Sequence, residues 1–221
     1  MASDAAGHAA TGALGAGLAG QASGLGGLGN AVSATVGQRA LVGHLAVPAS
    51  WAAAALCLDS RRGNADAYLA NDVPAWIRAN LTIDRRPRAW AIAGASYGGT
   101  CALQLATNHP DVYPTFVDIA GAAEPTLGDR PTTIAEAFGG DEAAFIRVNP
   151  LDLLRAHRYS DSAAATVVGA ADHNTTPDAR RVYEATRGAD MNSHYAELPG
   201  KHDWRLFAAP LVRELLWLTG R

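Results

Sequence analysis

The hydrophobic positions of residues 56–221 alternate between short apolar runs and stretches in which apolar side chains recur every three or four residues. Short apolar runs are typical of buried strands, and the wider spacing is typical of helices that bury one face. Strands alternating with helices predict an α/β fold with a parallel sheet covered on both faces. The predicted strands are 56–58, 89–93, 112–120, 163–169 and 194–198, and the predicted helices are 66–81, 97–108, 177–186 and 204–218.

An irregular insertion, residues 121–160, interrupts this alternation and contains three short helical patterns, near 133–138, 142–148 and 150–157. We expect it to form a lid over a site at the sheet edge, with Phe138, Phe145 and 151–154 as its apolar lining. The alternative is a surface excursion that packs on itself.

The first 50 residues have a different composition. Half of them are Gly or Ala, none is aromatic, and Asp4 and Arg39 are the only charged side chains. Such a segment has little to bury and much backbone entropy to lose on folding. We therefore expect residues 1–55 to form a largely disordered tail and residues 56–221 to form the folded domain.

Composition narrows the function classes. The net charge of −3 gives no electrostatic case for nucleic-acid binding. Cys57 and Cys101 are too few for a disulfide framework or a metal site, so we expect Cys101 to be a small buried hydrophobe and we expect no metal or cofactor. The N-terminus shows no signal-peptide pattern, and no apolar run reaches the roughly 18 residues of a membrane span.

The motif with the most chemical content is Gly94-Ala95-Ser96-Tyr97-Gly98, which lies between a predicted strand and a predicted helix. A serine at the apex of a sharp strand-to-helix turn is the arrangement called a nucleophile elbow. The flanking glycines allow the strand and the helix to pass closely in this strained turn. Ser96 is therefore the predicted nucleophile.

A serine hydroxyl needs a histidine to take its proton and an acid to orient that histidine. The chain offers them in the order Ser, acid, His, each after a predicted strand: Asp172 follows 163–169, and His202 follows 194–198. The carboxyl ends of parallel strands meet at one edge of the sheet, where ligands bind in open α/β folds. The predicted triad is Ser96, Asp172 and His202.

Several residues compete for these roles. Asp178 and Asp190 are alternative acids, while His109, His173 and His194 are better explained by structural roles. The backbone N–H of Tyr97 is the first predicted oxyanion donor. A second donor normally comes from an upstream loop, and there the Gly/Ala-rich tail offers no strand-and-loop unit.

Five segments together resemble the Putative esterase family, which includes esterase D and the mycobacterial mycolyltransferases. They are the elbow, Asp59–Gly63, Asp72–Ile77, Asn108–Pro110 and Gly200–Trp204. The resemblance implies an α/β-hydrolase fold and a serine esterase or acyltransferase acting on small-molecule or lipid esters, with Ser96 as nucleophile, Asp172 as acid and His202 as base. It also suggests a secreted or cell-envelope setting.

The N-terminal side departs from that family, whose members have further strands before the one matching 56–58. Instead, Gly43–Trp51 resembles an element of the mycobacterial PPE proteins. We therefore expect a hydrolase sheet that lacks its N-terminal strands, with an open edge that favours self-association. The alternative function is an inactive fusion or remnant that serves as a PPE-like antigen or interaction protein.

Overall fold

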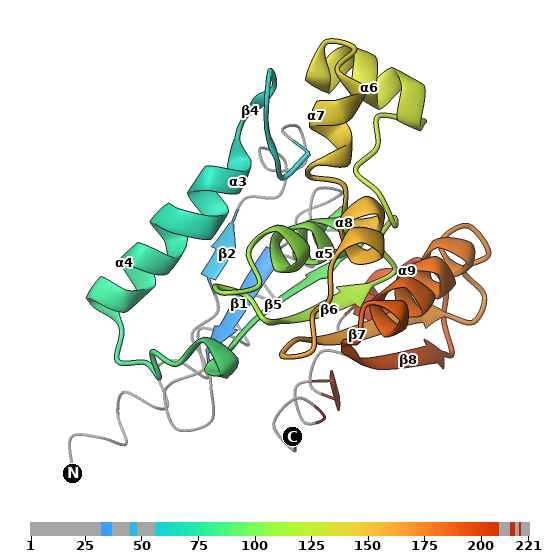
Figure 1. Cartoon of the computed structure of the whole chain (residues 1–221). Coiled ribbons are helices and arrows are strands. Elements are labelled where there is room, and N and C mark those ends of the chain that lie inside the picture. The colour runs from blue at the N-terminus through green and yellow to red at the C-terminus, as the bar shows by residue number, and fades with distance from the viewer. Residues whose placement is uncertain (1–31, 37–44, 48–55, 208–212, 215–216, 218–221) are drawn as a thin grey trace.

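A six-stranded sheet runs through the centre of the molecule (Figure 1). The computed structural model describes residues 32–36, 45–47, 56–207, 213–214 and 217. The strand order is β2-β1-β5-β6-β7-β8, in which β5 to β8 are parallel and β1 is antiparallel to both of its neighbours. The strands are β1 Val32–Val36, β2 Leu45–Val47, β5 Trp90–Ala95, β6 Thr115–Ile119, β7 Ala163–Gly169 and β8 Asn192–Leu198.

Helices follow the parallel strands, as the apolar spacing predicted. The α5 helix follows β5, and α9 lies between β7 and β8 in the chain. The helices are α3 Ala65–Ala67, α4 Val73–Asn80, α5 Tyr97–Asn108, α6 Arg130–Phe138, α7 Glu142–Ile146, α8 Pro150–Ala156 and α9 Thr176–Gly188. A π-helical turn, η1 Tyr68–Asp72, joins α3 to α4, and a short 3-10 helix, η2 Pro87–Ala89, precedes β5.

The sheet buries both of its faces. Along β6, the side chains of Phe116 and Val117 point to opposite faces because successive residues of a strand alternate. Phe116 belongs to the apolar cluster that contains Leu105 of α5, and Val117 belongs to the cluster that contains Phe207. The central strands β6 and β7 are consequently buried along their whole length.

Two strands lie in the segment that we expected to be a disordered tail. β1 pairs with β5, with Val36 opposite Trp90 and Val32 opposite Gly94, and β2 pairs with β1. These two short strands depart from the expectation of a disordered tail over residues 1–55, and β1 covers the edge of β5, while the expected absence of N-terminal strands and the expected self-association stay predictions. An exposed strand edge presents unpaired N–H and C=O groups, which an apolar segment of the same chain can satisfy. Residues 1–31, 37–44 and 48–55 lie outside the described residues.

The predicted strand at 56–58 is also wrong. Leu56 and Cys57 have φ angles of 60° and 51°, which no strand adopts, and the chain turns here before a short hairpin of β3 Asp59–Ser60 and β4 Gly63–Asn64. The turn is buried, and Gln104 of α5 donates its side-chain N–H to the buried Leu56 carbonyl at 3.1 Å. The apolar run at 56–58 therefore reflects burial in a turn.

A disulfide joins Cys57 to Cys101 of α5, which the sequence analysis did not expect. Both side chains are buried, and their Cα atoms lie 5.5 Å apart, within the usual range for this bond. The turn at 56–58 is thus attached covalently to the helix that follows Ser96.

The insertion contributes α6, α7 and α8, of which α6 and α7 stand away from the sheet (Figure 1). Phe145 is fully buried, edge-to-face with Phe138 at 5.5 Å between ring centroids. Leu151 and Leu154 join the core cluster that includes residues of α5. The contact of Phe145 with Phe138 agrees with the alternative in which the insertion packs on itself, the contacts of Leu151 and Leu154 also attach it to the core, and the lid role stays a prediction.

The last helix is described only in part: residues 204–207, 213–214 and 217 are helical. Within the described part of the chain, no helix is both long enough and apolar enough to cross a membrane.

Candidate active site

The turn between β5 and α5 has the geometry of a nucleophile elbow. Ser96 lies between the last residue of β5 and the first residue of α5, with φ 54° and ψ −127°. Its backbone N–H donates to the Ile119 carbonyl of β6 at 2.8 Å, which holds the strained residue at the sheet edge. A Cβ atom on Gly94 would lie only 2.0 Å from the Gly98 carbonyl oxygen, so the motif requires a glycine at position 94.

We expect Gly94→Ala to destabilise the fold strongly. Its methyl group meets backbone, which cannot rotate away, so the cost should reach the upper end of overpacking effects, about 3 kcal/mol. The measurement is the free energy of unfolding in urea. Gly188→Ala is the matched control, because a Cβ atom there meets nothing within 4 Å. Equal stabilities of the two variants would contradict the tight elbow.

The structure brings the three predicted triad side chains together. The Nε2 atom of His202 lies 2.9 Å from Ser96 Oγ, and its Nδ1 atom lies 2.7 Å from Asp172 Oδ2. Ser96, Asp172 and His202 follow the carboxyl ends of β5, β7 and β8 respectively. This is the serine–histidine–acid geometry in which each member acts on the next.

Asp172 is held by the start of α9. Thr175 donates both its hydroxyl and its backbone N–H to the carboxylate, and the Thr176 hydroxyl donates to the Asp172 carbonyl. Burial acts to raise the pKa of Asp172, but the hydrogen bonds from Thr175 and His202 outweigh it and hold the pKa below its usual value. Asp172 is therefore ionised at neutral pH and can orient the imidazole.

His202 is held in place by a turn and by an aromatic ring. A Cβ atom on Gly169 would lie 2.7 Å from the Gly200 carbonyl oxygen, so the ends of β7 and β8 approach closely just before His202. The Phe207 ring contacts the imidazole edge-to-face, at 5.0 Å between centroids. The His202 side chain is 37% exposed, so a substrate can reach it.

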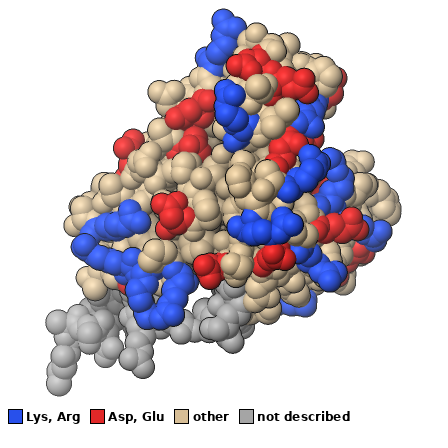
Figure 2. Space-filling model, in the orientation of Figure 1, with Lys and Arg blue, Asp and Glu red and all other residues tan. Residues whose placement is uncertain are grey.

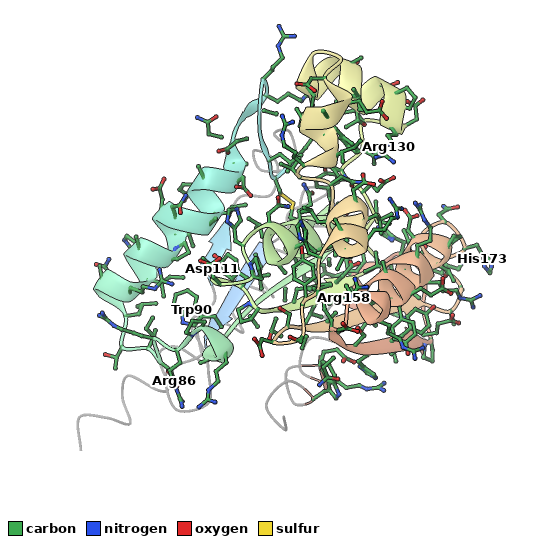
Figure 3. The ribbon with its side chains drawn as sticks, in the orientation of Figure 1. Arg86, Trp90, Asp111, Arg130, Arg158 and His173 are labelled. Carbon is green, nitrogen blue, oxygen red and sulfur yellow. A yellow bond between two sulfur atoms is a disulfide. The ribbon has the colours of Figure 1, made fainter. Side chains whose placement is uncertain are left out.

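The competing residues lie elsewhere. Asp178 pairs with Arg181, and Asp190 pairs with Arg158. His173 is exposed and lies at the outer edge of the molecule (Figure 3). The remaining two histidines have carboxylate partners of their own: His109 lies 2.7 Å from Asp66, and His194 lies 2.7 Å from Glu214.

Tyr97 is the first residue of α5, and its role as oxyanion donor stays a prediction. Its backbone N–H belongs to the first turn of a helix, where N–H groups have no partner within the helix. Residues 37–44 and 48–55, upstream of the elbow, lie outside the described residues, and no second donor is assigned.

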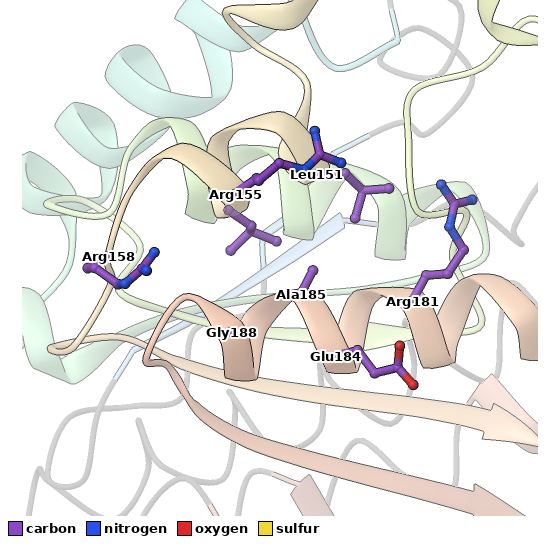
Figure 4. Close-up of a pocket in the computed structure, with 8 residues that line it drawn as sticks. Leu151, Arg155, Arg158, Arg181, Glu184, Ala185 and Gly188 are labelled. Atoms are coloured by element: carbon purple, nitrogen blue, oxygen red, sulfur yellow. The ribbon is translucent and has the colours of Figure 1, made fainter.

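An open groove of about 410 Å³ lies between α8 and α9 (Figure 4), and Ser96, Asp172 and His202 are not among the residues that line it. Leu151, Leu154 and Ala185 supply its apolar side chains, and three arginines line it. Each arginine pairs with a carboxylate: Arg155 with Asp152, Arg158 with Asp190, and Arg181 with Asp178. Basic and acidic side chains are interspersed on this face (Figure 2), so the groove carries no excess charge that would select an anion.

Two features of the site region do not follow from the sequence pattern, the disulfide at Cys101 and the buried carboxyl of Asp118 in β6. For Asp118, the available signal is an acidic residue in the middle of a predicted apolar strand. In the described part of the chain, no group of three or more His, Cys, Asp or Glu side chains could hold a metal ion.

Comparison with known proteins places the chain among esterases. The family model described as Putative esterase matches residues 48–218. An uncharacterised protein of Corynebacterium glutamicum is 37% identical over 171 residues, which are 75% of this chain and 40% of that protein. The diacylglycerol acyltransferase/mycolyltransferase Ag85C of Mycobacterium leprae is 32% identical over 73 residues, which are 33% of this chain and 21% of that protein. The chain thus spans less than half the length of these relatives.

Solved structures share the fold. An S-formylglutathione hydrolase from Agrobacterium tumefaciens superposes with a TM-score of 0.63 at 22% identity, over 76% of this chain and 63% of that one. MPT51 (FbpC1) of Mycobacterium tuberculosis superposes with a TM-score of 0.60 at 18% identity, over 81% and 77%. The chain has the α/β-hydrolase fold predicted for it and belongs to the Putative esterase family.

Proposed function

We propose that this chain is a serine esterase or acyltransferase that works through a covalent acyl-enzyme on Ser96. The observation that carries the proposal is the continuous hydrogen-bonded path from Ser96 Oγ through His202 to Asp172, with distances of 2.9 and 2.7 Å. Membership of the esterase family supports it. An assembled triad also favours an enzyme over the inactive remnant or PPE-like interaction protein.

In the first half of the reaction, Ser96 Oγ attacks the ester carbonyl carbon while His202 Nε2 takes the hydroxyl proton. The carbonyl oxygen becomes an oxyanion, to which the Tyr97 backbone N–H donates. The tetrahedral intermediate collapses, the C–O bond to the leaving alcohol breaks, and His202 returns the proton to that alcohol. Asp172 stays ionised throughout and stabilises the imidazolium.

In the second half, His202 takes a proton from water or from an acceptor alcohol, whose oxygen attacks the acyl carbon. The bond from the acyl carbon to Ser96 Oγ breaks, and the serine regains its proton from His202. Water as the acceptor gives an esterase, and an alcohol gives an acyltransferase. We propose lipid-like esters as the substrate class, because mycolyltransferases are among the relatives that the chain matches over part of their length.

The direct test is active-site labelling. We expect a fluorophosphonate probe to add one phosphonyl group to the folded wild-type protein, with the adduct on the peptide that contains Ser96. His202→Ala should slow labelling at least about 100-fold, because the serine loses its general base. Mass spectrometry locates the adduct. A folded protein that does not label, or that labels at another serine, overturns the proposal.

A further inference from the structure

A carboxyl side chain that the proposed reaction does not use is buried directly behind the elbow. Asp118 lies in β6, opposite Gly94 of β5 on one side and Thr166 of β7 on the other, and it is 0% exposed. One oxygen, Oδ1, accepts the backbone N–H of Gly121 at 2.8 Å. Among the described residues, the buried Oδ2 atom has no hydrogen-bond partner, and neither has the buried Thr166 Oγ1.

Asp118 contacts both segments that surround the elbow. A Cβ atom would lie 2.0 Å from Asp118 Oδ1 if placed on Gly99 of α5, and 2.4 Å if placed on Gly121. Next to it, the Thr100 hydroxyl accepts the backbone N–H of Ala122 at 2.8 Å. These contacts hold the start of the β6–α6 loop against the first turn of the helix that begins with the predicted oxyanion donor.

The surroundings of Asp118 disfavour its charged form. Burial raises the pKa of Asp118 to about 7, the hydrogen bond from Gly121 opposes this rise, and the nearby charge of Asp178 adds to it. Gly99 of α5 lies against the carboxyl, Thr166 of β7 lies opposite Asp118 in the sheet, and Asp178 of α9, which is paired with Arg181, is near enough for its charge to act on it. Among the described residues, no Lys, Arg or His forms an ion pair with this carboxyl.

The charge of this carboxyl changes the electrostatic potential at the start of α5. The first turn of a helix carries a partial positive charge, which stabilises an anion that forms at its N–H groups. A carboxylate behind the same turn would weaken that positive potential, whereas an uncharged acid would not. An uncharged acid also keeps Oδ1 as an acceptor for Gly121 and can donate a proton to a neighbouring oxygen.

We propose that Asp118 is a positioning residue that fastens the β6–α6 loop to the nucleophile helix, and that it supports turnover as an uncharged acid. The catalytic part of this inference rests on the proposed function. The charge state of Asp118 does not, because it can be read from the stability of the folded protein alone.

The test compares Asp118→Asn, which keeps the acceptor and can never ionise, with Asp118→Ala, which removes the acceptor. Activity is followed as kcat and KM on a p-nitrophenyl ester between pH 6 and pH 8.5. We expect kcat of Asp118→Asn relative to wild type to rise about ten-fold as the pH passes 7. Asp118→Ala should lose about ten-fold or more in kcat at pH 6, where the wild-type carboxyl is uncharged, with KM within about two-fold of wild type. Ser160→Ala, which removes an exposed hydroxyl between α8 and β7, is the control and should follow the wild-type pH profile.

The second readout is the melting temperature against pH, which needs no substrate. Between about pH 4 and pH 7 the unfolded wild-type chain has released a proton that the folded protein retains, so wild-type stability falls with rising pH in this window. Asp118→Asn has no such carboxyl. Its melting temperature should therefore rise relative to that of wild type by about 5 °C or more between pH 4 and pH 7, with no further rise above pH 7.

The two readouts separate the possible failures. A constant difference in melting temperature from pH 4 to pH 8 would overturn the uncharged acid, whatever the activity. With active wild-type protein, an unchanged kcat for Asp118→Ala, or a flat ratio of Asp118→Asn to wild type, would overturn the positioning role. A wild-type protein that neither labels nor turns over would overturn the proposed function and the positioning role, while the melting curves would still decide the charge.

Discussion

Ser96→Ala is expected to lower kcat for ester hydrolysis by about 10⁴- to 10⁶-fold, the largest effect of any single substitution in this chain. Removing the nucleophile of an assembled triad leaves only substrate binding and oxyanion stabilisation to accelerate the reaction. Ser96 Oγ lies 2.9 Å from His202 Nε2, and His202 Nδ1, on the other side of the ring, lies 2.7 Å from Asp172 Oδ2. The measurement is the initial rate on p-nitrophenyl esters of increasing acyl length.

The matched control is Ser160→Ala, which removes an exposed serine hydroxyl between α8 and β7. It should leave both kcat and the melting temperature at wild-type values. Ser96→Ala should also keep the wild-type melting temperature to within a few degrees, so that its loss of rate is chemical. A Ser96→Ala protein that retains more than about a tenth of the wild-type rate would place the nucleophile elsewhere.

The second large effect is expected from the disulfide between Cys57 and Cys101. The bond closes a loop with a sequence separation of 44 residues, for which the chain-entropy treatment gives about 4 kcal/mol of stability. For a domain of this size, that loss corresponds to a melting temperature lower by about 8–16 °C. We expect the double variant Cys57→Ser/Cys101→Ser to lose this free energy of unfolding and to show the corresponding fall in melting temperature.

The measurement is the free energy of unfolding in urea of the wild type and of both double variants, after expression in an oxidising compartment, where such bonds form and persist. The Cys57→Ala/Cys101→Ala double variant is the control for placing two hydroxyl groups in buried positions, and it should show most of the same loss. Two titratable thiols in the untreated, denatured wild-type protein would show that the bond is not formed. Equal urea midpoints for all three proteins would show that it contributes no stability.

Several features of this protein could be predicted from the sequence because they depend on residues that are neighbours in the chain. The period of the apolar residues predicted α5 and the four parallel strands of the sheet, since a helix or a strand sets which nearby residues share a face. The Gly94-to-Gly98 motif predicted the elbow because a strained turn requires particular residues at adjacent positions. Asp172 and His202 could be predicted to lie at the same edge of the sheet as Ser96, because each follows a predicted strand and parallel strands end at one edge.

Other features were decided only by the tertiary structure, because they join residues whose proximity no local pattern encodes. Composition predicted a tail over residues 32–36, yet this segment pairs with β5, whose free edge offers it hydrogen-bond partners. The apolar run at 56–58 predicted a strand, but contacts with α5 hold it as a turn. The environment of Asp118 arises from Gly99, Gly121 and Asp178, which come from three separate parts of the chain. A disulfide can form only where the fold brings two cysteines to the right distance, and the pKa of a carboxyl rises only where the fold removes it from water. Neither the distance nor the desolvation exists before the sheet is assembled.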